Sequence, residues 1–160
     1  MATKNLSNYD PNEIPDASEM SFGIVVSEWN RGITENLLKG CVDTLEKHGV
    51  QRHSIKLRYV PGSFELPLGA QWMAEGREVD AVICLGSVIR GETAHFDFVC
   101  QACSQGVKDV ALRMNLPVIF GVLTDDNEDQ AIARSGGKLG NKGDEAAITA
   151  IKMVALGESF

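Results

Sequence analysis

The segment Gly86–Thr93 lies between a strongly apolar run and a helical pattern, which is where phosphate-binding loops occur. It nearly matches the motif G-x-x-x-x-G-K-[ST], but Glu92 stands where that motif has its lysine. A carboxylate there would repel a triphosphate, so the sequence argues against a nucleoside triphosphatase. The glycine turn and helix still offer free N–H groups at the positive end of a helix dipole, where one phosphate could bind. A tight turn without a ligand explains the same residues equally well.

His95 comes two residues after Thr93, at the expected start of this helix. The positive end of the helix dipole disfavours the imidazolium form, so the ring stays neutral and is suited to moving protons. A structural histidine is the alternative, but the place of His95 at the end of a strand favours the functional interpretation. His48 and His53 lack this context, and we expect both at the surface.

Trp29 follows the first apolar strand, where its ring could stack on a planar heterocycle or pack over the edge of the sheet. The segment Val60–Glu65 ends the next strand and offers backbone amides, the Ser63 hydroxyl and the Glu65 carboxylate. These groups suit hydrogen bonding to a polyol or to a pyrimidine edge. The alternative is local, with Ser63 capping the next helix and Glu65 favoured by the dipole of its first turn. Trp72 falls mid-helix and is predicted to be core.

Three cations, Arg134, Lys138 and Lys142, cluster around a glycine-rich stretch of an otherwise acidic chain. Alone they describe an ordinary solvated loop. Beside a phosphate site they would form an anion clamp. Their spacing does not say whether they reach a site in their own subunit or in a neighbour.

The cysteine and aspartate pairs of the sequence are weaker indications of redox or metal chemistry. Cys100 and Cys103 form a C-x-x-C, but well inside a helix, where packing explains them better than a redox pair at a helix start. No second pair completes a zinc set. Asp125 and Asp126 follow the fourth strand, whereas a response-regulator receiver has its acidic pair after the first strand, where this chain has Ser27–Glu28. We therefore expect no metal.

Composition limits the class of protein. The chain has 160 residues, 44% hydrophobic and 23% charged, which is typical of one globular domain. Its net charge of −7 argues against nucleic acid and anionic membranes as partners. The beginning lacks an apolar leader, no apolar run approaches a membrane span, and four cysteines are too few for a disulfide scaffold. These features predict a cytoplasmic protein.

The elements that must position these residues alternate along the chain. We expect strands over about 22–26, 54–60, 79–88 and 117–123. We expect helices over about 30–48, 94–115 and 144–156, together with one that ends at about 75 and one that starts near 127. Residues 1–20 form a mobile or extended arm, and 21–160 a single domain. The order predicts a three-layer α/β/α sandwich with a four-stranded parallel flavodoxin-like sheet. Ligands of such sheets bind at the carboxyl ends of the strands, which here lead into 27–31, 61–65, 86–95 and 124–127.

Five segments, in this order and spacing, resemble the lumazine synthase family (6,7-dimethyl-8-ribityllumazine synthase) from Met20 to the end of the chain. They are Trp29–Asn30, Val60–Glu65, Gly86–Asp97, Pro117–Thr124, and Asp129–Arg134 with Lys138–Gly143. The resemblance implies condensation of 5-amino-6-(D-ribitylamino)uracil with 3,4-dihydroxy-2-butanone 4-phosphate, releasing phosphate and water, in riboflavin biosynthesis. It implies no metal and no organic cofactor, only small-molecule substrates and proton transfers between positioned groups.

The resemblance also implies roles for individual residues. Trp29 would stack on the pyrimidine, and His95 would be the proton donor or acceptor. The remaining substrate contacts would come from side chains that hold the ribityl chain, border the uracil or close the aromatic pocket: Ser63, Phe64, Glu65, Ser87, Val88, Ile89, Phe120 and Lys138. The phosphate would be held by the backbone amides of Glu92 and Thr93 and by the side chain of Arg134.

In this family Phe120, Arg134 and Lys138 reach the site from the neighbouring subunit of a pentamer, so the resemblance implies a homo-oligomer with active sites at subunit interfaces. The stretch Gly136–Gly143 carries no insertion, which resembles members that assemble sixty subunits into an icosahedral shell. Free pentamers are the alternative. The arm of residues 1–20 would pair with a neighbour's sheet.

Two other functions fit part of the pattern. Trp29 could make the protein a shell that binds riboflavin or lumazine with little catalysis, although His95 and Arg134 argue against lost activity. A generic flavodoxin-like protein could bind FMN through the loop that carries Glu92, but this leaves the cationic glycine-rich stretch unexplained.

Overall fold

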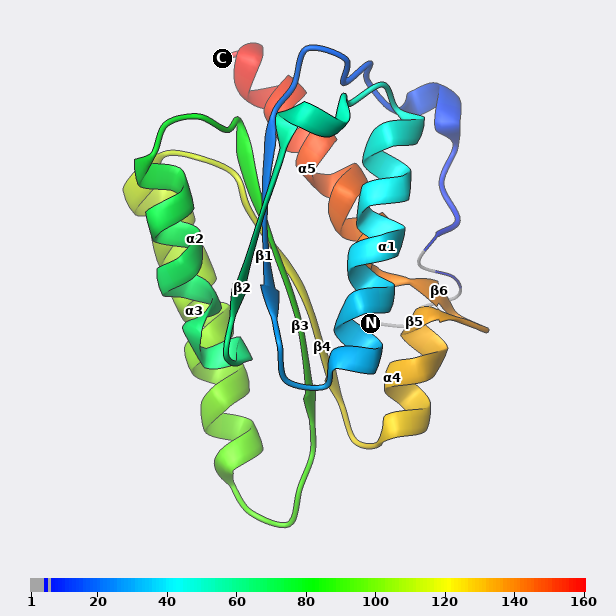
Figure 1. Ribbon diagram of the computed structural model, residues 1–160, viewed down its shortest axis with the longest axis vertical. Helices are drawn as coiled ribbons and strands as arrows, with labels where there is room; N and C mark the ends of the chain where they lie inside the picture. Colours follow the sequence, from blue (N-terminus) through cyan, green and yellow to red (C-terminus); the bar gives the residue numbers. More distant parts are fainter. Residues whose placement is uncertain (1–4, 6) are drawn as a thin grey trace.

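The computed structural model describes residue 5 and residues 7–160, and its centre is a four-stranded sheet (Figure 1). The strand order is β2-β1-β3-β4, and every neighbouring pair is parallel. All four carboxyl ends therefore lie at one edge of the sheet. The strands are β1 (Phe22–Ser27), β2 (Ile55–Val60), β3 (Ala81–Ile89) and β4 (Val118–Asp125).

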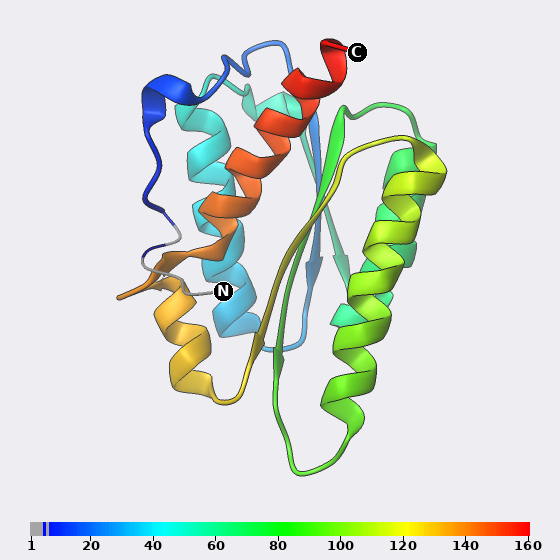
Figure 2. The ribbon, with the colours of Figure 1, turned by 180° about the vertical axis from the view of Figure 1, so that it is seen from behind.

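Helices cover both faces of this sheet. One face carries α2 (Leu66–Glu75) and α3 (His95–Met114), which lie side by side. The other face carries α1 (Arg31–Lys47), α4 (Glu128–Arg134) and α5 (Lys142–Glu158), as the view from behind shows (Figure 2). The three-layer α/β/α sandwich with a parallel flavodoxin-like sheet is thereby confirmed.

The apolar side chains of the strands divide between two cores. Ile24 and Ile83 pack with the helices α1 and α5, whereas Val25, Val82 and Cys84 pack with α2 and α3. Successive side chains of a strand point to opposite faces, so a sheet covered on both faces needs apolar residues at every position. This explains the uninterrupted apolar runs in the sequence.

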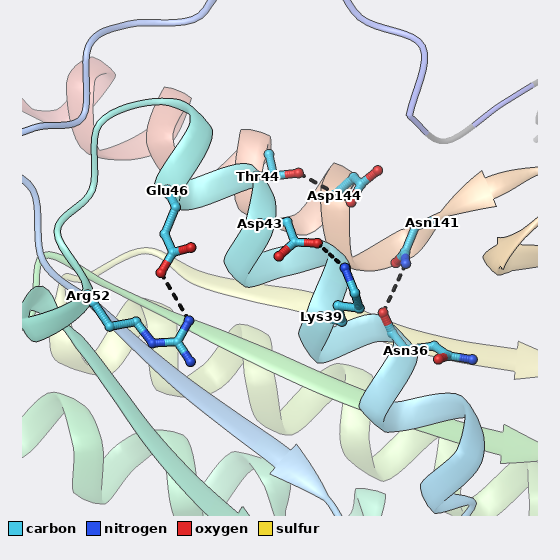
Figure 3. Close-up of polar contacts among 8 residues, drawn as sticks. All are labelled: Asn36, Lys39, Asp43, Thr44, Glu46, Arg52, Asn141 and Asp144. Carbon is cyan, nitrogen blue, oxygen red and sulfur yellow. Dashed lines mark hydrogen bonds and ion pairs between the residues drawn. The ribbon is translucent and has the colours of Figure 1, made fainter.

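The contact between α1 and α5 is held by polar groups at the start of α5 (Figure 3). Asn141 caps α5 by accepting a hydrogen bond from the backbone N–H of Gly143 at 2.8 Å. The Asn141 amide also donates to the backbone oxygen of Asn36 in α1 at 3.0 Å. Further along α1, the Thr44 hydroxyl donates to Asp144 Oδ1 at 3.2 Å. These bonds fix the glycine-rich stretch that precedes α5 against α1.

That stretch is more ordered than a loop. It forms two short antiparallel strands, β5 (Ser135–Gly137) and β6 (Gly140–Asn141), and α5 begins at Lys142 rather than near Asp144. The pairing is possible because Gly136 and Gly140 adopt φ angles of 104° and 84°, which residues with a Cβ rarely adopt.

The prediction that Trp72 is a core residue is wrong, because 64% of its surface is exposed. The buried residues of α2 are Leu66, Ala70 and Ala74, spaced four apart, and Trp72 lies on the opposite side of the helix. The expectation that His48 lies at the surface is also wrong, since it is half-buried with its Nε2 enclosed, whereas His53 is exposed.

The segment before β1 packs on its own subunit over part of its length. Ile14, Ala17 and Met20 are buried among the residues of the core that includes α1 and α5. The ring of Tyr9 lies 6.0 Å from that of His48 at the end of α1. Residues 1–4 and 6 of the expected arm lie outside the described residues. Its pairing with a neighbour's sheet stays a prediction.

Candidate functional site

A cavity of about 780 Å³ lies at the carboxyl ends of β1, β2 and β3. This volume is in the range of pockets that enclose small molecules. The sheet edge itself creates the hollow, because the loop after each strand turns away toward its helix. Nine of the thirteen site residues expected from the sequence line it, namely Trp29, Ser63, Phe64, Glu65, Ser87, Val88, Ile89, Thr93 and His95.

Two serine hydroxyls in this cavity lack a hydrogen-bond partner. Ser63 and Ser87 are 6% and 1% exposed, and neither Oγ has a partner within the described part of the chain. Ser63 therefore does not cap α2, and the local alternative for this residue fails. A buried hydroxyl without a partner is unfavourable, so these two groups indicate a place for polar atoms of a ligand.

Gly86 leaves room for the Ser63 hydroxyl beside β3. A Cβ on Gly86 would lie 2.6 Å from Ser63 Oγ and 2.9 Å from a methyl carbon of Leu66. Such distances leave no room for a side chain, so the glycine is required by packing at this point.

Exposed aromatic rings border the cavity. Trp29 and Phe64 are 73% and 59% exposed, although both line the hollow. The backbone N–H of Trp29 donates to the carbonyl of Pro61 at 3.2 Å, which joins the loop after β1 to the loop after β2. The flat face of Trp29 is thus free for a planar ring to stack on.

Asn30 holds the Trp29 loop in place. Its backbone is left-handed, with φ 57° and ψ 47°, and its side-chain amide donates to the backbone oxygen of Ser87 at 2.9 Å. In the sequence, Asn30 stands out only as part of the segment Trp29–Asn30. The signal was available, since asparagine is the residue besides glycine that most often adopts this conformation.

His95 is the first residue of α3 and lies exposed at the cavity. Its backbone N–H donates to the hydroxyl of Thr93 at 3.4 Å, within the loop Gly91–Thr93 that precedes the helix. The side chain therefore stands at the amino-terminal, positive end of α3, as the sequence predicted. This arrangement can hold an anion and move a proton next to it.

Four expected site residues do not line the cavity. Glu92 is exposed in its loop, where its backbone amide rather than its side chain was expected to act. Phe120 is partly buried on β4 against the α2–α3 core, Lys138 is exposed between β5 and β6, and Arg134 ends α4. One subunit thus does not bring its cationic cluster to its own cavity.

Arg134 instead faces a buried carboxylate. Its Nη1 lies 3.6 Å from Oδ1 of Asp125, which is 2% exposed and whose Oδ2 has no partner among the described residues. Burial raises the pKa of Asp125, and the Arg134 guanidinium opposes that rise. From the sequence, the only function considered for Asp125 is that of a metal ligand. Its contact with Arg134 is made through space and leaves no signal in the spacing.

The cysteines and acidic residues show no sign of metal or redox chemistry within residues 5 and 7–160. Cys103 is buried, Cys100 is half-buried, and both are free thiols. Burial raises the pKa of Cys103 to about 12, which disfavours the reactive thiolate. In the same residues, no three His, Cys, Asp or Glu side chains gather as metal ligands would.

Similarity to known proteins decides the family. A family model described as 6,7-dimethyl-8-ribityllumazine synthase matches residues 19–158. The chain belongs to the lumazine synthase family. It is 62% identical to the 6,7-dimethyl-8-ribityllumazine synthase of Cytophaga hutchinsonii over 154 residues, which cover 96% of each chain. It is 58% identical to the enzyme of that name from Parabacteroides distasonis over 153 residues, again 96% of each chain.

The matched span contains the whole sheet and every lumazine synthase segment recognised in the sequence. The resemblance stated from those segments is therefore confirmed at the level of the family. No helix among the described residues is long and apolar enough to cross a membrane.

Proposed function

We propose that this chain catalyses the condensation of 5-amino-6-(D-ribitylamino)uracil with 3,4-dihydroxy-2-butanone 4-phosphate to 6,7-dimethyl-8-ribityllumazine, a transferase reaction of riboflavin biosynthesis. The observation that carries the proposal is the cavity at the ends of β1, β2 and β3, with its aromatic rim and two unpartnered hydroxyls. The family match and the names of the relatives support it.

The pyrimidine stacks on Trp29 and meets the polar groups of Ser87, while the ribityl chain extends toward Ser63 and Glu65. Holding the two substrates together makes the first step, attack of the amine on the ketone carbonyl, effectively intramolecular. The amides of Glu92 and Thr93 take the phosphate. The reaction then needs loss of water, elimination of phosphate and ring closure.

His95 moves protons in these steps. It lies beside the phosphate-binding amides at the start of α3 and lines the cavity. A neutral ring can take a proton from the substrate carbon or amine and return it to the leaving oxygen. No group other than positioned side chains and amides is required for this chemistry.

We infer that the site is completed by a neighbouring subunit, which supplies Arg134, Lys138 and Phe120. These three residues do not line the cavity of their own subunit, which supports the inference. Large apolar side chains also lie exposed on the outer faces of α2 and α3, as expected of a surface that copies of the chain cover: Leu68, Trp72, Phe98 and Leu112. Assembly as a pentamer or as sixty subunits, and a cytoplasmic location, are further parts of this proposal.

The test is formation of a fluorescent lumazine and stoichiometric phosphate from the two substrates. His95→Ala is expected to lower kcat by about 100-fold or more, whereas His53→Ala, an exposed histidine outside the cavity, leaves it unchanged. Equal rates in the two variants would remove the proton-transfer role from His95. Absence of product from the purified wild-type oligomer would overturn the proposed activity. Flavin retained by that oligomer would then favour the binding shell.

A further inference from the structure

Arg90, directly after β3, holds three separate groups with one guanidinium. Its Nε donates to Oδ1 of Asp126 at 2.9 Å, and its Nη1 donates to Oδ1 of Asp97 at 3.3 Å. The guanidinium carbon lies 4.1 Å from the centre of the Phe96 ring. The backbone N–H of Arg90 donates to the carbonyl of Asp125 at 2.9 Å. Arg90 does not line the cavity and has no role assigned above.

These contacts surround the segment Gly91–His95, which carries the amides and the histidine of the site. Arg90 precedes this segment, while Phe96 and Asp97 follow it in the first turn of α3. Residues 90–95 are all exposed, and α3 has no side-chain hydrogen bond at its N-cap, so core packing does little to hold the segment. Arg90 thus joins both ends of the segment to each other.

The third partner fixes the segment to the rest of the sheet. Asp126 belongs to the turn between β4 and α4, and Ile89 pairs with Asp125 at the end of the β3–β4 ladder. Phe96, only 8% exposed, is itself a wall of the cavity. Loss of the Arg90 side-chain contacts would therefore remove the link between the segment and the β4–α4 turn and leave one face of Phe96 uncovered.

We propose that Arg90 is a positioning residue that holds Gly91–His95 in the geometry needed to bind the phosphate-bearing substrate. The inference rests on the function proposed above. Arginine suits the role because its planar fork gives donors in fixed directions and its flat face stacks on an aromatic ring, which lysine cannot reproduce.

The contribution is to geometry rather than to stability. The side chains of Arg90, Asp97 and Asp126 are 44%, 62% and 68% exposed, and ion pairs in such surroundings add little to the free energy of unfolding. Rates respond differently, since a displacement of about 1 Å in a site can lower a rate about 100-fold. Kinetics can thus separate a positioning role from a merely structural one.

The first experiment compares Arg90→Gln and Arg90→Lys with Arg52→Gln. Arg52 is a matched control, because it pairs with Glu46 at 3.0 Å on the exposed surface away from the cavity (Figure 3). For Arg90→Gln, KM for the dihydroxybutanone phosphate is expected to rise about tenfold or more and kcat to fall, with KM for the pyrimidine changed less than about twofold. Arg90→Lys should recover only a part of this loss. The thermal midpoints of the three variants should agree.

Three kinetic results would overturn the proposal. One is an Arg90→Gln variant that behaves like Arg52→Gln. The second is an equal rise in KM for both substrates. The third is full recovery in Arg90→Lys, which would show that charge alone matters. If Arg90→Gln does not fold, Asp126→Ala removes the acceptor of Nε and should give the same pattern in weaker form.

A second measurement keeps this inference separate from the proposed activity. Hydrogen–deuterium exchange of the peptides covering residues 88–97 should be faster in Arg90→Gln than in wild type and unchanged in Arg52→Gln. Titration with inorganic phosphate should show weaker binding in Arg90→Gln only. If the wild type forms no lumazine, the proposed function fails while the exchange data still test the role of Arg90. Unchanged exchange would overturn that role even in an active enzyme.

Discussion

At the scale of single residues, the cavity is marked by polar atoms that the folded chain leaves without partners. Ser63 Oγ and Ser87 Oγ are enclosed in it, and Oδ2 of Asp125 lies at the end of the neighbouring strand β4. Each such group lowers stability by about 1–3 kcal/mol relative to a satisfied one. Three of the four such atoms among the described residues lie at this edge of the sheet, the fourth being Nε2 of His48, which is consistent with the proposed binding site there.

Ser63→Ala tests whether this hydroxyl lowers stability and contributes to substrate binding. Because the hydroxyl has no partner in the empty protein, its removal should leave the free energy of unfolding unchanged or raise it by up to about 1 kcal/mol. The same change should raise KM for the pyrimidine substrate about tenfold, since a ligand hydrogen bond is lost. Urea unfolding and steady-state kinetics measure the two effects. Ser104→Ala, on the exposed surface of α3, is the control. Lower stability with an unchanged KM would contradict the assignment.

Asp125 gives a pH-dependent prediction. Burial raises its pKa above 3.8, so the folded protein keeps this proton to a higher pH than the unfolded chain does. Its contribution to stability is therefore present below pH 3.8 and is lost as pH rises through the folded-state pKa. Asp125→Asn should exceed wild type in stability at neutral pH, and the difference should disappear near pH 4.

The measurement is the urea midpoint of both proteins between about pH 4 and pH 8. Arg134 is 38% exposed, so water can solvate it when the carboxylate is removed, and the variant leaves no stranded charge. Asp43→Asn, which changes an exposed carboxylate on α1, should show no such trend. A destabilised Asp125→Asn at neutral pH would show that the ion pair with Arg134 outweighs the burial of Asp125.

At the scale of elements, the close approach of α1 and α5 depends on glycine. A Cβ on Gly143 would lie 2.0 Å from the backbone oxygen of Leu37, and one on Gly40 would lie 2.4 Å from the side chain of Asn141. Backbone cannot move aside as a flexible side chain can. The two helices are therefore in contact at the point where the chain leaves β6, which sets the direction of the cationic stretch.

Two glycine substitutions in α5 should have opposite effects. Gly143→Ala is expected to lower the free energy of unfolding by about 1–3 kcal/mol, because α5 must move away from α1. Gly157→Ala, with nothing within 4 Å of its new Cβ, should raise it by up to about 1 kcal/mol through better helix propensity. Chemical unfolding of the two variants and wild type measures both. A neutral Gly143→Ala would mean that α1 and α5 can separate freely.

At the scale of the whole molecule, the cavity and the cationic residues proposed to complete it lie apart in one chain. The cavity holds His95, while Arg134 and Lys138 lie outside it, on the side of the molecule that carries α4 and β5. A cyclic assembly with head-to-tail contacts would place the second part of one copy against the cavity of the next. In the proposed assembly, this geometry would explain why an acidic chain has its cationic stretch remote from the loop proposed to bind phosphate.

Mixing two inactive variants tests the shared site directly. His95→Ala and Arg134→Ala are each expected to lose most activity, but subunits refolded together in equal amounts should recover about a quarter of the wild-type rate, because such a share of sites receives both native residues. The assay is lumazine formation before and after mixing, with each variant refolded alone as the control. A site formed within one subunit would show no recovery.

The sequence by itself determined the layers, the parallel pairing of the strands and the edge of the sheet at which the cavity lies. Apolar runs such as 81–85 can only be strands covered on both faces, and the residues after each strand must then meet. The exposure of Trp72 could not be predicted in this way, because it depends on which side of α2 packs on the sheet and on what covers the outer side of the helix. Helical spacing alone does not say either.

Only the tertiary structure decided which side chains find partners. Ser63 follows β2 and Ser87 lies in β3, and neither hydroxyl has a partner among the described residues, which their positions in the sequence do not reveal. The contact of Arg90 with Asp126 depends on the register that pairs Ile89 with Asp125, and the contact of Arg134 with Asp125 depends on how α4 packs at the end of β4. Local spacing fixes the conformation of a segment, whereas contacts between distant segments arise from packing, and this is why they appear only in the folded molecule.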